Sequence, residues 1–145
     1  MCPGKQLAKG RDGKPHYRSL LADLRSFKED YSISTCVCLL DDYEMRTLGV
    51  DPKNYKAICA EIGLTLIQFP IVEIAVPSDP RAYELQVIDR IIESLLKGEN
   101  VVVHCRGGMG RAGMTAACVS TRLFYFKSAK SLISFIREMR SSRAI

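Results

Sequence analysis

Apolar residues recur along the chain in spacings that predict alternating helices and strands. Between residues 17 and 29, Leu20, Leu21, Leu24 and Phe27 follow helical spacing, so we expect a helix there. Short apolar runs predict strands at 34–40, 64–69 and 101–104, and longer segments predict helices at 51–62, 80–97, 113–125 and 128–140. Residues 1–16 are polar and rich in glycine and lysine, which favours an irregular segment. Strands that alternate with helices indicate an α/β fold with a central, mainly parallel sheet flanked by helices.

The composition predicts one folded domain. The chain has 145 residues, 47% of them hydrophobic and 26% charged, and we expect a single domain over residues 1–145. No apolar run approaches the roughly 18 residues that a membrane span needs, and the N-terminal residues lack the apolar stretch of a signal peptide. The six cysteines lack the spacing of metal ligands, so we expect no metal, no cofactor and a reducing compartment. We therefore expect a monomer in the cytoplasm, with the nucleus as an alternative.

Charge and cysteine placement exclude two further roles. The net charge of +5 is spread along the chain, with no basic stripe interleaved with aromatic residues, so we expect no nucleic-acid partner. A mildly basic surface suits phosphorylated or acidic substrates. Cys36 and Cys38 lie two positions apart in a predicted strand and share one face. We attribute them to core packing and not to a metal site.

The segment 101–113 carries the candidate chemistry. An apolar β-branched run ends in His104 and Cys105, and a glycine-rich turn then leads to Arg111 and a helix rich in small residues. This order presents the cysteine at the mouth of a loop whose N–H groups converge next to a helix N-terminus. Such a loop binds an anion and holds a nucleophile at its floor. We interpret the segment as the site of a cysteine-dependent phosphatase; the alternative is a buried strand cysteine beside a glycine turn.

Each position in this segment has a chemical reason. Only a thiolate attacks phosphorus, and a helix N-terminus with a nearby cation favours that form. Arg111 can grip two phosphoryl oxygens in a planar fork, which lysine cannot do. The glycines suit a cradle that needs unusual φ values and close backbone approach, and His104 is expected to orient the loop through its ring hydrogen bonds. With Arg111, the residues expected to bind phosphate are Arg106, Gly107, Gly108, Met109 and Gly110.

The run His-Cys-x-x-Gly-x-Gly-Arg at 104–111 resembles the signature of the protein tyrosine and dual-specificity phosphatases. Within them, the chain is most similar to the branch of cyclin-dependent-kinase-associated phosphatases. This similarity includes Pro70-Ile71, the helix at 131–140 and residues 143–145. The resemblance implies the cysteine-phosphatase fold, a phosphocysteine intermediate, no metal, and phosphoprotein substrates that include phosphothreonine on a cell-cycle kinase. These relatives have a strand before the segment that matches Cys2 and a further helix after Ile145, so we expect either a minimal version of the fold or a chain trimmed at both ends.

Phosphate transfer also needs a general acid, and two carboxylates compete for this role. Matching Pro70-Ile71 and Pro77 to the loop of these phosphatases puts Glu73 where they carry an aspartate. Asp79 is the rival, although its place before Pro80 is that of a helix N-cap, which is a sufficient structural role. We favour Glu73 as the acid. The alternative is that Glu73 is only a water-exposed residue at the end of a strand.

Ala112 departs from the pattern of most of these phosphatases, which have serine or threonine after the arginine. The resemblance implies that this hydroxyl helps the cysteine sulfur to leave. The phosphatases of regenerating liver also have alanine there, so its loss is tolerated. We expect Cys105 to become phosphorylated readily and the phosphoenzyme to break down slowly.

Three functions therefore stay open at the level of the sequence. The first is a phosphatase of phosphoserine, phosphothreonine and phosphotyrosine in proteins. The second is a catalytically weak or inactive module that binds phosphoproteins through Cys105 and Arg111. The third is a phosphatase of phosphoinositides or another non-protein phosphate, for which Arg106 would add charge inside the loop.

Overall fold

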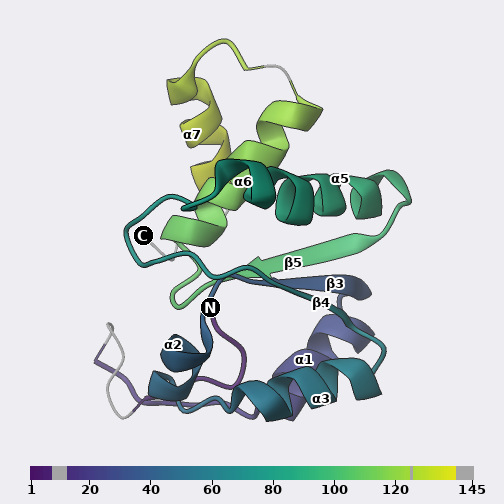
Figure 1. Ribbon diagram of the computed structural model, residues 1–145, viewed down its shortest axis with the longest axis vertical. Helices are drawn as coiled ribbons and strands as arrows, with labels where there is room; N and C mark the ends of the chain where they lie inside the picture. Colours follow the sequence, from purple (N-terminus) through teal and green to yellow (C-terminus); the bar gives the residue numbers. More distant parts are fainter. Residues whose placement is uncertain (8–12, 125, 140–145) are drawn as a thin grey trace.

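The computed structural model describes residues 1–7, 13–124 and 126–139. A three-stranded parallel sheet lies at its centre, in the order β4–β3–β5 (Figure 1). Its strands are β3 (Ile33–Cys38), β4 (Thr65–Gln68) and β5 (Asn100–His104). In the register of the sheet, Cys38 of the central strand lies opposite Gln68 on one side and His104 on the other. The parallel sheet expected from the apolar runs is confirmed.

Helices cover both faces of this sheet, as Figure 1 shows. On one face lie α1 (Leu20–Glu29), α2 (Asp42–Thr47) and α3 (Pro52–Glu61). On the other lie α5 (Asp89–Leu96) and α6 (Gly110–Leu123), and α7 (Ala129–Met139) packs against α6. α5 continues directly from α4 (Pro80–Tyr83) and a π-helical segment, η1 (Glu84–Ile88). The α/β class is therefore confirmed, with helices on both faces of a parallel sheet.

The helices begin where the sequence provides caps. The Ser19 hydroxyl accepts the amide of Ala22 at the start of α1, and Asp51 caps α3 ahead of Pro52. Apolar residues at helical spacing then face the core, as the burial of Leu24 illustrates. Cys36 and Cys38 of β3 lie within the same core, which confirms that they are packing residues.

Several expected boundaries were wrong. Residues 1–16 are not wholly irregular, because β1 (Gln6–Leu7) and β2 (His16–Tyr17) form an antiparallel pair. α2 was not expected, and the helix over 80–97 contains the π-helical segment η1. α6 begins three positions before residue 113, where its first turn closes the glycine-rich loop. The expected elements at 125, 140 and 143–145 lie outside the described residues.

The topology brings three connecting segments to one edge of the sheet. In a parallel sheet the carboxyl ends of all strands lie at the same edge, where ligands of α/β proteins bind. The segment of Leu39 and α2 follows β3, residues 69–79 follow β4, and the loop of Cys105 follows β5. Within the part of the chain that the structure describes, no helix is long and apolar enough to cross a membrane.

Candidate active site

The loop after β5 places Cys105 at the centre of the candidate site. The side chain is almost fully buried, and the amide of Gly108 donates a hydrogen bond to its Sγ over 3.3 Å. This hydrogen bond places the sulfur against the backbone of the loop that follows it. The N-terminal segment packs against the same loop, since the amide of Cys2 donates to the carbonyl of Arg106 over 3.4 Å.

The expectation that all three loop glycines need special backbone geometry was only partly right. Gly108 has a φ of +75°, in the left-handed region that favours glycine. Gly107 and Gly110 have no such φ, and a Cβ at Gly110 would have no neighbour within 4 Å. The loop therefore needs glycine at one position, and spacing alone does not distinguish that position from the other two.

Arg111 lies in the first turn of α6 and is held by groups from three segments. Its Nη1 donates to Glu44 Oε2 over 2.6 Å and its Nη2 to Glu44 Oε1 over 2.9 Å. Nη1 also donates to the carbonyl of Ile71 over 2.6 Å and that of Leu39 over 3.4 Å. Hydrogen bonding to Glu44 raises the pKa of Arg111 above its ordinary value. The side chain is 5% exposed, so the guanidinium is fixed in one orientation beside the loop.

Sequence reasoning missed Glu44, the carboxylate that orients Arg111. It lies in α2, whose N-cap is Asp41: the Asp41 side chain accepts the amide of Glu44 over 2.7 Å. A usable signal existed, because Asp41, Asp42 and Glu44 lie within six positions after the buried strand β3. Polar residues at the carboxyl end of a parallel strand are candidates for the site.

His104 supports the loop from below and does not face the substrate side. It is buried, and its Nε2 lies 2.9 Å from the hydroxyl of Tyr55 in α3, which is in turn 3.2 Å from Cys36 Sγ. Burial lowers the pKa of His104 to about 3, so its ring is neutral at physiological pH. The ring hydrogen bond agrees with the expected orienting role, and sequence reasoning missed Tyr55.

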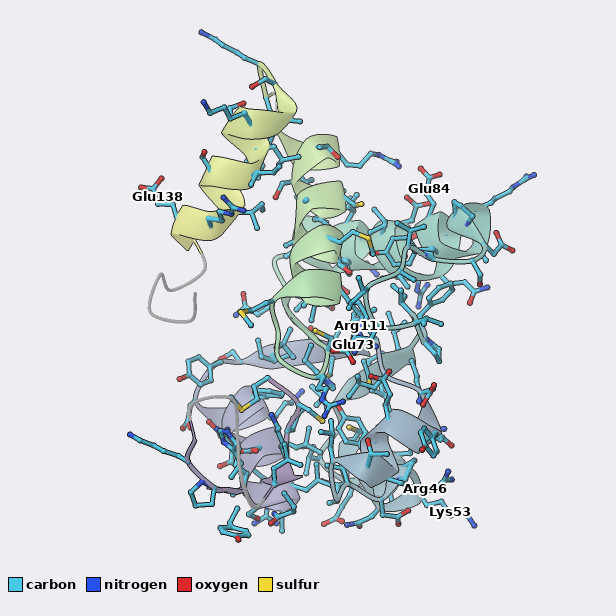
Figure 2. All side chains as sticks on the ribbon, turned by 90° about the vertical axis from the view of Figure 1, so that its left-hand side faces the viewer. Arg46, Lys53, Glu73, Glu84, Arg111 and Glu138 are labelled. Atoms are coloured by element: carbon cyan, nitrogen blue, oxygen red, sulfur yellow. The ribbon has the colours of Figure 1, made fainter. Side chains whose placement is uncertain are left out.

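The two candidate acids occupy different environments. Asp79 caps α4, accepting the amide of Ala82 over 2.9 Å, which confirms the structural role expected for it. Glu73 lies in a turn after β4, about half exposed, with its Oε2 3.8 Å from Nη1 of Arg106. Figure 2 shows Glu73 and Arg111 together near the N-terminal end of α6. Of the two carboxylates, only Glu73 is free of a helix cap and placed beside the loop.

A cleft of about 450 Å³ adjoins the loop. Its walls come from α2, from the turn after β4 and from the loop itself. The lining residues are Asp41, Tyr43, Glu44, Thr47, Val72, Glu73 and Arg106. Two of its three carboxylates are paired with arginines, Glu44 with Arg111 and Glu73 with Arg106, and Asp41 caps α2.

The start of α6 lacks a hydroxyl near the sulfur. Ala112 is buried, and the first hydroxyl of the helix is that of Thr115. This hydroxyl donates to the carbonyl of Arg111 over 3.0 Å and accepts from Tyr83 over 2.7 Å. Thr115 thus secures the backbone of Arg111 and does not replace the missing donor at position 112.

Among the described residues, no three His, Cys, Asp or Glu side chains are grouped so that they could hold a metal ion. All six cysteines are free thiols, so no disulfide constrains the loop.

The buried Cys105 accepts a loop amide, and Arg111 is fixed at the start of the following helix. This arrangement defines the class of cysteine-dependent protein phosphatases. A family model described as "Polymorphic toxin system, DSP-PTPase phosphatase" matches residues 13–123. The chain belongs to this family of dual-specificity and tyrosine phosphatase domains.

Known proteins show the same relationship. The chain is 26% identical over 92 residues to Cyclin-dependent kinase inhibitor 3 of Rattus norvegicus, covering 63% of this chain and 42% of that protein. It is 31% identical over 68 residues to the tyrosine phosphatase candidate 067L of Invertebrate iridescent virus 3, covering 46% of this chain and 28% of that protein. The chain thus spans less than half the length of these two relatives.

Two solved structures share the fold. One is a kinase-associated phosphatase whose catalytic cysteine is replaced by serine, with a TM-score of 0.82, 22% identity, and coverage of 99% of this chain and 75% of the other. The other is Tk-PTP in its active form, with a TM-score of 0.64, 23% identity, and coverage of 97% of this chain and 87% of the other. The resemblance to the dual-specificity phosphatases and to the kinase-associated branch is confirmed.

Proposed function

We propose that the chain hydrolyses phosphate monoesters of serine, threonine and tyrosine in proteins through a phosphocysteine intermediate. The observation that carries this proposal is the geometry of two residues. Cys105 Sγ accepts the Gly108 amide, and the Arg111 guanidinium is fixed by Glu44 at the start of α6. This arrangement pairs a nucleophile with a preoriented cation for the phosphoryl oxygens.

In the first step, the Cys105 thiolate attacks phosphorus in line with the leaving oxygen. A P–S bond forms as the P–O bond breaks, while loop amides and Arg111 hold the three remaining oxygens. Glu73 donates a proton to the leaving serine, threonine or tyrosine oxygen. Its half-exposed position beside the loop supports this role, and the capping contact of Asp79 speaks against the rival.

In the second step, water attacks the phosphocysteine. Glu73 takes a proton from the water, a P–O bond forms, and the thiolate leaves as the P–S bond breaks. Ala112 offers no hydroxyl to the departing sulfur, and Thr115 is bonded elsewhere. We therefore propose that breakdown of the intermediate limits turnover.

The second candidate function is a module that binds phosphoproteins without turnover, and the lack of a hydroxyl at Ala112 is the observation in its favour.

A kinase substrate is a further proposal, supported by the similarity to Cyclin-dependent kinase inhibitor 3 and to kinase-associated phosphatase. We further propose that the chain acts as a monomer in a reducing compartment such as the cytoplasm, in keeping with its free thiols.

One experiment tests the proposed function. The chain is mixed with a generic aryl phosphate, and intact mass and released phosphate are followed together, with Cys105→Ser as the blank. Continuous release that is lost in the variant is expected. A phosphate adduct with little release would instead support the binding module, and absence of both would contradict the proposal.

A further inference from the structure

The turn after β4 exposes three aliphatic side chains around the candidate acid. Val72 is 76% exposed, Ile74 100% and Val76 73%, whereas Ile71 just before them is buried in the core. We call Val72, Ile74 and Val76 the apolar rim. Single exposed aliphatic residues are common on protein surfaces, but three within five positions beside a catalytic loop suggest a contact surface.

Ile74 combines a strained backbone conformation with a fully exposed aliphatic side chain. The amide of Ala75 donates to the carbonyl of Val72 over 3.1 Å, which closes a turn in which Ile74 has a φ of +65°. This third position of a turn favours glycine or asparagine, and a β-branched residue is strained there. Because the side chain is fully exposed, no packing offsets the strain. Residues with strained backbone conformations cluster at active sites and ligand contacts, which makes Ile74 a candidate contact residue.

The apolar rim meets the cleft beside the Cys105 loop at Val72, the one rim residue that lines it. Val72 and Glu73 form one wall of that cleft, and exposed Tyr43 lies on the wall contributed by α2. A phosphorylated residue whose phosphate reaches Cys105 would place its neighbouring residues against these side chains.

We propose that the apolar rim binds the polypeptide next to the phosphorylated residue and selects substrates with a large apolar side chain there. This deepens and rests on the proposed function, because it names the class of phosphoprotein that the same site accepts. Ile74 and Val72 bury aliphatic surface against that side chain when the substrate binds. The bound substrate thereby supplies the packing that Ile74 lacks in the free protein.

The test uses two phosphopeptides that differ only in the residue beside the phosphorylated threonine, leucine in one and asparagine in the other. With the unaltered chain, kcat/KM for the leucine peptide is expected to exceed that for the asparagine peptide about tenfold. Ile74→Gly should reduce this ratio to about twofold, chiefly through KM, since it removes the aliphatic group. It should not lower the urea midpoint, because glycine adopts a φ of +65° without strain.

Leu96→Ala is the matched control. Leu96 is 77% exposed and ends α5, just before β5 begins, so it lies at the opposite edge of the sheet from the loop. This variant should keep the tenfold ratio. An equal kcat/KM for both peptides in the unaltered chain, or an unchanged ratio in Ile74→Gly, would overturn the proposal.

Binding separates this proposal from the proposed function. If the chain releases no phosphate, affinities of the two phosphopeptides for Cys105→Ser are measured. A preference for the leucine peptide that Ile74→Gly abolishes supports the apolar rim even without catalysis, whereas equal binding or no binding overturns it. Co-sedimentation with neutral phosphatidylcholine vesicles that depends on Ile74, without a peptide preference, would assign the rim to a membrane and also overturn the proposal.

Discussion

Replacement of Glu44 by glutamine removes the charge that fixes Arg111 and leaves the size of the side chain unchanged. The carboxylate of Glu44 accepts hydrogen bonds from both terminal nitrogens of Arg111, over 2.6 and 2.9 Å. Glutamine keeps one acceptor oxygen and turns an NH₂ group toward a guanidinium that can only donate. One of the two charge-assisted hydrogen bonds is therefore lost, and the other becomes a bond to a neutral acceptor.

The expected cost follows from burial. Each hydrogen bond to a charged group contributes about 1.5–3 kcal/mol, and breaking a buried ion pair costs roughly 3–5 kcal/mol. Here the side chain of Arg111 is 5% exposed and that of Glu44 17%. In the variant, Nη1 of Arg111 can still donate to the carbonyls of Ile71 and Leu39. We therefore expect Glu44→Gln to lower the free energy of unfolding by about 2 kcal/mol. Loss of orientation at Arg111 should lower kcat/KM by about 10- to 100-fold.

Glu84→Gln is the matched control for this measurement. Glu84 also pairs with an arginine, since Nη1 of Arg122 lies 2.5 Å from its Oε1, but both side chains are about half exposed. Figure 2 shows Glu84 well away from Arg111. The same substitution there should cost less than about 1 kcal/mol and leave kcat/KM unchanged.

Urea unfolding and phosphate release from an aryl phosphate, measured for both variants, test the reasoning. Glu44→Gln should shift the urea midpoint without a change in slope and should lower kcat/KM even where the chain is fully folded. If the two variants match each other in stability and in kcat/KM, the ion pair does not orient Arg111, and the role assigned to Glu44 is wrong.

Four further predictions concern the same site. Arg111→Lys should retain about 1% or less of kcat, because lysine lacks the planar fork, and near-full phosphate release would refute that reasoning. Glu73→Gln should slow the hydrolysis of phosphate esters with poor leaving groups by about 10²- to 10³-fold, and that of aryl phosphates less. Asp79→Asn keeps an N-cap and should change neither rate. The reverse result would make Asp79 the acid. Ala112→Ser should raise steady-state turnover by speeding release of phosphate from Cys105, and an unchanged rate in a stopped-flow comparison would exclude that bottleneck. Burial lowers the pKa of His104 to about 3, so between pH 6.5 and 3 only the unfolded chain takes up a proton at this residue. The free energy of unfolding should therefore fall by about 1.4 kcal/mol for each pH unit as the pH decreases through that window. Unfolding of His104→Asn, measured over the same range, should lack this contribution.

Hydrophobic spacing was sufficient to predict the sheet and most helices, but it could not predict α2. The three apolar runs became the three parallel strands, and the cap at Asp79 lies where the sequence indicates. α2 has six residues, of which Met45 alone is buried, so it is too short to show a helical period. Its position depends on the strand before it, which is a tertiary effect.

The nucleophile and the arginine were identifiable from local order, whereas the pairing of each support with its partner was not. Cys105 and Arg111 lie within one loop and helix start, where spacing carries the geometry. Glu44 is 67 positions from Arg111, and Tyr55 is 49 positions from His104. No local pattern reports such pairs, because the packing of α2 and α3 beside the sheet brings them together. Spacing also could not tell that only Gly108 of the loop glycines has a positive φ.

The contacts of Arg111 indicate that the site depends on the whole sheet and not on the loop alone. Its carbonyl partners, Leu39 and Ile71, follow β3 and β4, and Glu44 follows β3 through α2. The guanidinium is therefore oriented only when β3, β4 and β5 are aligned in register at their carboxyl ends. The turn that supplies Ile71 also carries Glu73 and the strained Ile74, so the residue that helps to fix the cation is joined to those proposed to meet the substrate. Contact at the apolar rim is thus linked by a few bonds of backbone to the orientation of Arg111.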